Sequence, residues 1–189
     1  MHMPHPTREE LEAELATIRR APPDEGLLRL IVRRPAVNER EVLESAELNA
    51  AHGLVGDSWG SRHDRRRGGG EPDPDTQLNM MSARAIAAVA RDEGRWPLAG
   101  DQLFVDLDLS EANLPAGTRL AIGTAIIEVT PPPHTGCAKF VSRFGVDAMK
   151  FVNSTLGRSL RLRGLNARVV RNGTVRVGDR VRKLPHEGE

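Results

Sequence analysis

The sequence contains one cysteine, no tyrosine and no long apolar run. A single cysteine among 189 residues excludes an internal disulfide. No apolar run approaches the roughly 18 to 20 residues needed to cross a bilayer. The N-terminus, MHMPHPTREE, lacks the basic start and apolar stretch of a secretory signal. Together these absences predict a cytoplasmic protein in a reducing compartment, with no membrane partner.

Net charge and aromatic residues are also scarce. The formal net charge is +1, which gives no basis for a nucleic-acid partner. Aromatic residues make up 3% of the chain and hydrophobic residues 39%, which is globular composition with an aliphatic core. The length suits one domain that buries a continuous core without disulfides or metal.

The N-terminal segment TREELEAELATIRR predicts a helix. Thr7 precedes an apolar series that begins at Leu11, and Glu10 stands three places after Thr7, which is the spacing of a capping box. Pro22 ends the helix, because proline cannot continue the hydrogen-bond pattern. The helix is charged over most of its surface, so we expect it to pack as an appendage on the rest of the chain.

Most of the remaining segments alternate apolar and polar residues, which is typical of strands joined by turns. Two helices interrupt the pattern, one at 39–51 before Gly53 and one that Ser82 caps. The dipeptide Asn172-Gly173 between two alternating runs predicts a hairpin, because both central residues of a type I′ turn need positive φ. The expected strands are LLRLIVRR (27–34), QLNMM (77–81), QLFVDLDL (102–109), TRLAIG (118–123), TAIIEVT (124–130), RLRGLNARVVR (161–171) and TVRVGDRVRKL (174–184).

This order of elements predicts a mainly β fold, an antiparallel β-barrel with peripheral helices. We expect residues 1–26 to form the helical appendage, residues 27–184 the barrel domain, and residues 185–189 a flexible tail.

A polar loop interrupts the pattern at 56–76, GDSWGSRHDRRRGGGEPDPDT. It is about twenty residues long, and compact domains rarely keep such a loop without a purpose. One interpretation is a solvated, mobile insertion. The other is an anion-binding loop whose arginines hold phosphate, because guanidinium groups bind oxyanions in a bidentate manner. The arginines concerned are Arg62, Arg65, Arg66 and Arg67.

The only cysteine stands in TPPPHTGCAKF, residues 130–140. The three prolines stiffen the end of the preceding strand, and Gly136 allows the chain to turn before Cys137. Lys139 and His134 would favour the thiolate, which is the nucleophilic and metal-binding form. The competing interpretation is a small buried hydrophobe that is inert by position. The sequence shows no paired zinc-ligand spacing, no G-x-S-x-G and no phosphate-binding glycine motif.

The order of these features resembles the MOSC domain, the molybdenum cofactor sulfurase C-terminal domain, in its stand-alone bacterial type. The resemblance covers about residues 27–184 and rests on the order of the segments, with one cysteine after a proline-containing turn. The matching segments are HGLVGD (52–57), QLNMMS (77–82), LAGDQLFVDLDLSEANLPAGTRLAIGTAIIEVT (98–130), PPPHTGCAKF (131–140) and NARVVRNGTVRVGDRV (166–181).

The resemblance implies a barrel related to that of pyruvate kinase, and a protein that handles molybdenum cofactor or sulfur. The family's cysteine carries over to Cys137, as persulfide carrier or molybdenum ligand, and some members reduce N-hydroxylated compounds. The cofactor expected is the molybdenum cofactor (molybdopterin), with Arg62, Arg65, Arg66 and Arg67 on its phosphate. The partners implied are a PLP-dependent cysteine desulfurase or a redox partner.

The chain departs from the family pattern at two places. Gly100-Asp101-Gln102 stands where the family often has a G-E-N-like step, and His134 follows the prolines where an arginine is common. The alternative function is a non-catalytic binding module for an anionic metabolite or a protein partner, with Cys137 buried and inert.

Overall fold

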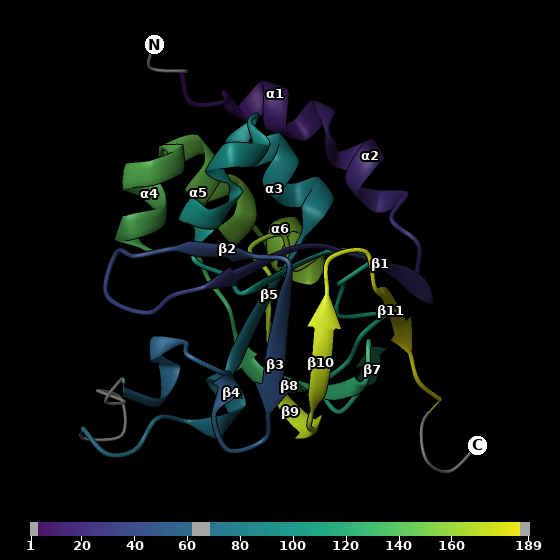
Figure 1. The fold of residues 1–189 in the computed structure, drawn as a ribbon. Helices are drawn as coiled ribbons and strands as arrows, with labels where there is room; N and C mark the ends of the chain where they lie inside the picture. The colour runs from purple at the N-terminus through teal and green to yellow at the C-terminus, as the bar shows by residue number, and fades with distance from the viewer. Residues whose placement is uncertain (1–3, 62–68, 186–189) are drawn as a thin grey trace.

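The structure is a computed structural model that describes residues 4–61 and 69–185 (Figure 1). Its strands are β1 (Glu25–Arg33), β2 (Glu41–Leu43), β3 (Ser45–Asn49), β4 (Gly53–Leu54), β5 (Leu78–Ser82), β6 (Leu103–Asp106), β7 (Arg119–Ile122), β8 (Ala125–Pro133), β9 (Leu165–Arg171), β10 (Gly173–Arg176) and β11 (Arg180–Lys183). Its α-helices are α1 (Arg8–Ala13), α2 (Leu15–Arg19), α3 (Ala83–Ala90), α4 (Ala138–Phe144), α5 (Val146–Asn153) and α6 (Thr155–Ser159), and its 3-10 helices are η1 (Ser58–Ser61), η3 (Pro74–Thr76) and η4 (Glu93–Ala99).

Seven strands form a closed barrel. They are hydrogen-bonded in the order β11, β7, β8, β9, β5, β6 and β1, and β1 pairs again with β11. The strand β2 extends the sheet from β1, while β10, β3 and β4 form a separate small sheet. The predicted mainly β barrel with peripheral helices is therefore confirmed. One pair, β5 with β6, is parallel, because α3 and η4 make the crossover that a parallel connection requires.

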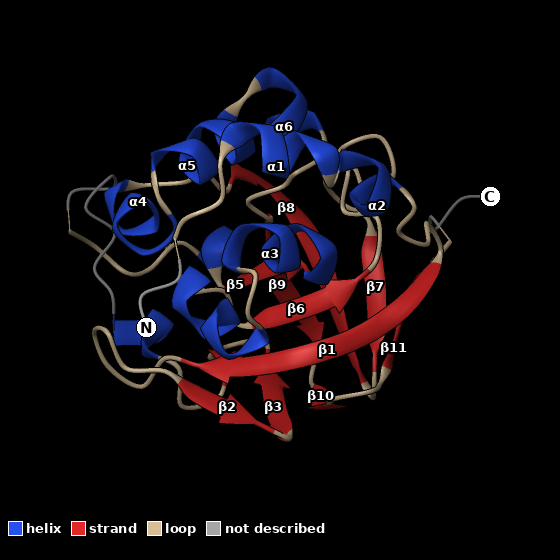
Figure 2. Ribbon diagram, turned by 90° about the horizontal axis from the view of Figure 1, so that it is seen from above, coloured by secondary structure: helices blue, strands red, loops and turns tan. Residues whose placement is uncertain are grey.

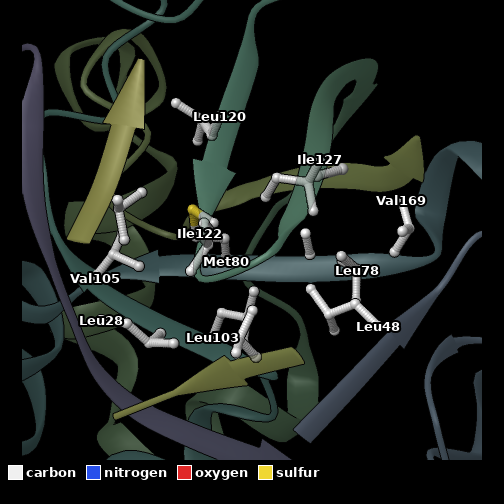
Figure 3. Close-up of a cluster of buried hydrophobic side chains, with 14 of the residues drawn as sticks. Leu28, Leu48, Leu78, Met80, Leu103, Val105, Leu120, Ile122, Ile127 and Val169 are labelled. Carbon is white, nitrogen blue, oxygen red and sulfur yellow. The ribbon is translucent and has the colours of Figure 1, made fainter. Parts of the chain in front are cut away.

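The barrel interior is aliphatic, as expected for a chain with few aromatic residues. Figure 3 shows the side chains of several strands pointing toward one another within this core. The labelled residues are all buried: Leu28, Leu48, Leu78, Met80, Leu103, Val105, Leu120, Ile122, Ile127 and Val169. Burial of this much apolar surface is the dominant favourable contribution to folding.

The helices cover one side of the barrel and enclose a second buried cluster (Figures 1 and 2). This cluster contains aromatic residues, which the barrel interior lacks, among them Trp96, Phe104 and Phe144. The predicted N-terminal helix is confirmed as α1 and α2, and Thr7 and Glu10 form the expected capping box. No helix among the described residues has the length and apolar character to cross a membrane.

Residues 39–51 do not form the predicted helix. They form β2 and β3, and Ala46 and Leu48 of β3 alternate with exposed residues and turn into the core. The helical composition misled the prediction, because Glu and Leu favour helices only when tertiary contacts do not decide otherwise. Here β3 pairs with β10, which lies far along the sequence.

The predicted hairpin at Asn172-Gly173 is also wrong. The strand β9 pairs with β8 and β5, while β10 pairs with β3, so β9 and β10 are not hydrogen-bonded to each other. Asn172 instead accepts a hydrogen bond from the amide of Ala50 at 2.8 Å. Gly173 allows β10 to approach the start of β8 closely, because a Cβ at this position would lie 2.4 Å from the backbone nitrogen of Ala125.

Candidate functional site

Cys137 is exposed at the start of α4, directly after the loop that leaves β8. Two helices, α4 and α5, follow the cysteine. The interpretation of Cys137 as a buried core residue is wrong, because its thiol faces solvent. Its position leaves the sulfur accessible to a ligand or reagent.

The backbone before Cys137 is fixed by α5. The amide of Gly136 donates to Asn153 Oδ1 at 2.9 Å, and Asn153 Nδ2 donates back to the Gly136 carbonyl at 3.1 Å. Gly136 does not have positive φ, so it provides no left-handed turn. Glycine instead allows this loop to pack closely on α5, because a Cβ at position 136 would lie 3.3 Å from the Val152 side chain.

A pocket of about 410 Å³ opens beside Cys137, between the β1–β2 loop, the end of η4 and the start of α4. We call it the Cys137 pocket. None of the described residues that line it is an aspartate or a glutamate, whereas five are cationic. The cationic residues are Arg34, Arg40, Lys139, Arg143 and Arg163. Arg34 and Arg163 are paired with buried carboxylates behind the lining, and the remaining positive charge favours an anionic ligand.

Four consecutive backbone carbonyls hold the four arginines in place. Each carbonyl from residue 97 to residue 100 accepts a hydrogen bond from a different guanidinium group, and the arginines come from segments far apart in the sequence. The bonds are Arg40 to Pro97 at 3.2 Å, Arg143 to Leu98 at 2.6 Å, Arg163 to Ala99 at 2.9 Å and Arg34 to Gly100 at 2.8 Å. Carbonyls at the end of a helix carry partial negative charge and attract cations.

Gly100 allows this convergence. Its φ is +88°, a left-handed value that a glycine adopts without steric cost. A Cβ there would lie 3.4 Å from Arg40 Nη2 and 3.9 Å from Arg143 Nη1. These are ordinary van der Waals distances, so the left-handed backbone at this turn, and not lack of space, favours glycine here.

Asp101 lies behind the pocket and joins His134 to Arg163. Its carboxylate is fully buried, and it accepts hydrogen bonds from Arg163 Nη1 at 2.6 Å and from His134 Nε2 at 3.0 Å. Burial acts to raise the pKa of Asp101, but Arg163 and His134 lower it to about 2. Asp101 is therefore ionised at neutral pH, and His134 must donate through Nε2 because a carboxylate only accepts.

His134 is held in its neutral form. Burial lowers the pKa of His134, the charge of Arg163 lowers it further, and Asp101 only partly opposes them. The expectation that His134 supplies a positive charge near Cys137 is therefore wrong at neutral pH. The guanidinium of Arg163 also lies over the ring of Phe140, 5.0 Å from its centroid.

A second buried ion pair supports the opposite wall. Arg34 and Asp57 form a bidentate pair with two bonds of 2.8 Å, and their side chains are almost inaccessible to solvent. Arg34 also donates to Asn79 Oδ1 at 3.1 Å. Because guanidinium groups bind carboxylates with fixed geometry, this pair fixes the direction of Arg34 at the pocket.

The structure brings together three of the seven predicted site residues. Cys137, His134 and Lys139 line one pocket. The other four, Arg62, Arg65, Arg66 and Arg67, lie outside the described residues. Sequence analysis missed Arg34, Arg40, Arg143 and Arg163. One signal was available: Arg34 and Arg163 interrupt or end apolar segments, where an arginine needs a specific partner.

The fold is similar to those of several solved bacterial proteins. YuaD from Bacillus subtilis matches with a TM-score of 0.60 and 18% identity, over 83% of this chain and 94% of that chain. YiiM from Escherichia coli matches with a TM-score of 0.54 and 18% identity, over 86% of this chain and 72% of that chain. YiiM from Geobacillus stearothermophilus matches with a TM-score of 0.52 and 12% identity, over 87% and 75% of the two chains.

The sequence comparisons point to one family. No curated protein sequence matches the chain. The family model described as MOSC domain matches residues 64–182, which is more than half of the chain and includes β5 to β10, most of β11 and Cys137. The chain belongs to the MOSC domain family.

Proposed function

We propose that the Cys137 pocket binds the molybdenum cofactor and that Cys137 supplies a sulfur ligand to its metal. The observation that carries this proposal is the exposed thiol at the edge of a pocket lined by five cationic side chains and no described carboxylate. The MOSC domain is associated with molybdenum cofactor in general, and the family membership supports a role with this cofactor or with sulfur.

The pocket residues fit the chemistry of the cofactor. A thiolate is a soft ligand of the type that suits molybdenum, and the phosphate of the pterin needs cationic groups. Lys139 and Arg143 have no carboxylate partner among the described residues, so their charges are available to a phosphate. The described residues contain no group of three or more His, Cys, Asp and Glu side chains arranged to hold a metal ion.

Each side of the pocket would contribute a different interaction. The hydrogen bonds between Gly136 and Asn153 fix the backbone before Cys137, so less entropy would be lost when its thiolate binds a metal. Lys139 and Arg143 would bind the phosphate. Burial and the charge of Arg163 keep His134 neutral, so the ring nitrogen that does not face Asp101 can accept a hydrogen bond from a substrate. The bound cofactor would supply the electron transfer needed to reduce N-hydroxylated compounds.

Copurification tests this proposal. The protein is expressed in a host that makes molybdenum cofactor, as wild type, Cys137→Ala, Lys139→Met and Arg182→Met, and its molybdenum and pterin contents are measured. Arg182 is exposed on β11 and does not line the pocket, so its variant is the matched control. We expect Cys137→Ala and Lys139→Met to retain at least about tenfold less cofactor, since a charge-assisted contact contributes roughly 1.5–3 kcal/mol.

Two results would end the ligand proposal. In the first, wild type and Cys137→Ala hold equal molybdenum. In the second, neither holds any. A loss in Arg182→Met equal to that in Lys139→Met would show that the positive charge acts generally and not through this pocket.

The exposed thiol also supports a role as a sulfur carrier. In that step, the Cys137 thiolate attacks the terminal sulfur of a persulfide on a PLP-dependent cysteine desulfurase. A new sulfur–sulfur bond forms, and the desulfurase thiolate leaves. After incubation with the desulfurase and cysteine, mass spectrometry should find one added sulfur atom on Cys137. If the desulfurase loads a known acceptor under the same conditions but leaves Cys137 unchanged, the carrier role is excluded.

A further inference from the structure

A second pocket lies on the other side of His134 and Arg163. It has a volume of about 160 Å³ and is lined by the end of β8, by α6 and by the residues before β9. We call it the proline pocket, because Pro131, Pro132 and Pro133 all line it. His134 and Arg163 also line the Cys137 pocket, whereas Cys137 does not line the proline pocket. The two pockets are therefore adjacent cavities that share two lining residues.

The size and one wall of the proline pocket suit a small apolar ring. Val152 and Leu165 line it together with the three prolines. A cavity of roughly 150 Å³ is sufficient to hold a benzene molecule, and typical drug-sized ligands need pockets of at least about 300 Å³. The volume therefore limits a ligand to about one ring with a small substituent.

Arg161 gives the pocket a cation without an ion-pair partner. Its Nη1 donates to the carbonyls of Leu114 at 2.6 Å and Leu109 at 3.4 Å, which fixes the guanidinium. No described carboxylate forms a salt bridge with it. Burial lowers the pKa of Arg161, and Glu111 only partly opposes this effect. A half-buried guanidinium with donors to spare is a strong site for a carboxylate.

The charges around the pocket leave one positive charge in surplus. The guanidinium groups are those of Arg158, Arg161 and Arg163. The carboxylates are Glu111, which lines the pocket, and Asp101, which is bonded to Arg163. Three cations against two anions favour a ligand with a single negative charge.

We propose that the proline pocket binds a small monocarboxylate, with its apolar ring or chain against the proline wall and its carboxylate on Arg161. This site stands apart from the proposed cofactor site, since it uses no sulfur and no metal. His134 lines both pockets.

Chemical-shift mapping with benzoate tests the proposal on the full chain. Benzoate has one ring and one charge, benzamide has nearly the same shape without the charge, and inorganic phosphate has charge without the ring. We expect saturable changes in the chemical shifts of Thr135, Arg158 and Gly164. The dissociation constant should be about 1 mM, a value reasonable for a ligand of this size. Benzamide should bind at least about tenfold more weakly, since it cannot form the charged bond.

Two variants and one control make the test specific. Arg158→Met removes an exposed guanidinium group that makes no hydrogen bond among the described residues, and it should weaken benzoate binding several-fold. Thr135→Phe places a ring at the exposed rim and should block binding without loss of fold. Arg182 lies outside the pocket, so the Arg182→Met protein should bind benzoate as the wild type does.

Three results would overturn the proposal. Equal affinity for benzoate and benzamide would show that Arg161 does not bind the carboxylate. Shifts at Lys139 and Arg143 instead of Thr135 and Gly164 would place the anion in the Cys137 pocket. Unchanged benzoate binding in Thr135→Phe would place it elsewhere. Because no cofactor is involved, each result is independent of the outcome for the proposed cofactor site.

Discussion

Asp101 lies behind both pockets and binds the two residues, His134 and Arg163, that line each of them. It is fully buried, and it holds both Arg163 and His134 by hydrogen bonds. A buried carboxylate must be paired, and breaking such a pair leaves an uncompensated charge in a medium of low polarity. The residue was visible in the sequence as part of Gly100-Asp101-Gln102, but its partners were not, because they lie far along the chain.

The variant Asp101→Asn should therefore be strongly destabilised. It leaves Arg163 buried without its carboxylate, and breaking a buried ion pair in this way costs roughly 3–5 kcal/mol. Urea unfolding measures the free energy of unfolding. The control is Asp24→Asn, whose side chain is 76% exposed and pairs with Lys183 at the surface; it should cost less than about 1 kcal/mol. Equal losses in the two variants would contradict the role of Asp101.

Cys137 should react as an exposed thiol. We expect a thiol reagent to label the folded protein at a rate close to that of the urea-unfolded protein, because the side chain needs no opening motion. Cys137→Ser should change the free energy of unfolding by less than about 0.5 kcal/mol, as is usual for surface substitutions. Labelling that becomes fast only after unfolding would show that the thiol is covered in solution.

At the scale of elements, the small sheet of β10, β3 and β4 was the part least accessible to prediction. The segment 39–51 contains residues that favour helices, and the dipeptide Asn172-Gly173 is a strong hairpin signal. Both local signals were overridden, because β3 and β10 pair with each other across the fold. Elements with strong local signals, such as α1 with its capping box and α3 with Ser82, were predicted correctly.

Gly173 should tolerate no side chain. A Cβ at this position would lie 2.4 Å from the Ala125 backbone nitrogen, so Gly173→Ala must move β10 away from the β7–β8 turn. Overpacking of this kind typically costs about 1–3 kcal/mol. The control is Gly60→Ala, because a Cβ there meets nothing within 4 Å and its φ is not positive. The midpoint temperature of thermal unfolding is measured for both variants. An unchanged midpoint in Gly173→Ala would contradict the close packing of Gly173 against Ala125.

For the whole molecule, the buried network predicts loss of stability in acid. The pKa of His134 is lowered from its ordinary value of 6.5, so below that pH the unfolded chain binds a proton that the folded protein resists. The pKa of Asp101 is lowered from 3.8 to about 2, so its contribution is complete above pH 3.8 and is lost as the pH falls through 2. For Asp101 this contribution is about 2 kcal/mol.

Urea unfolding at pH 7, 5 and 3 measures this dependence. The wild type should lose stability between pH 7 and pH 5, and His134→Gln should lose less, because its amide donates to Asp101 but does not titrate. The remaining loss toward pH 3 and below should persist in His134→Gln, since Asp101 is still present. Identical curves for the two proteins between pH 7 and pH 5 would show that His134 does not titrate in this range.

The order of motifs by itself determined the family and the barrel with peripheral helices. These follow from local patterns, because capping boxes, alternating runs and proline-containing turns act over a few residues. Only the tertiary structure decided what surrounds the cysteine. Arg34, Arg40, Arg143 and Arg163 meet at four consecutive carbonyls because the closed barrel brings the ends of separate strands and helices together. A convergence of this kind depends on the path of the whole chain, and no local pattern contains it.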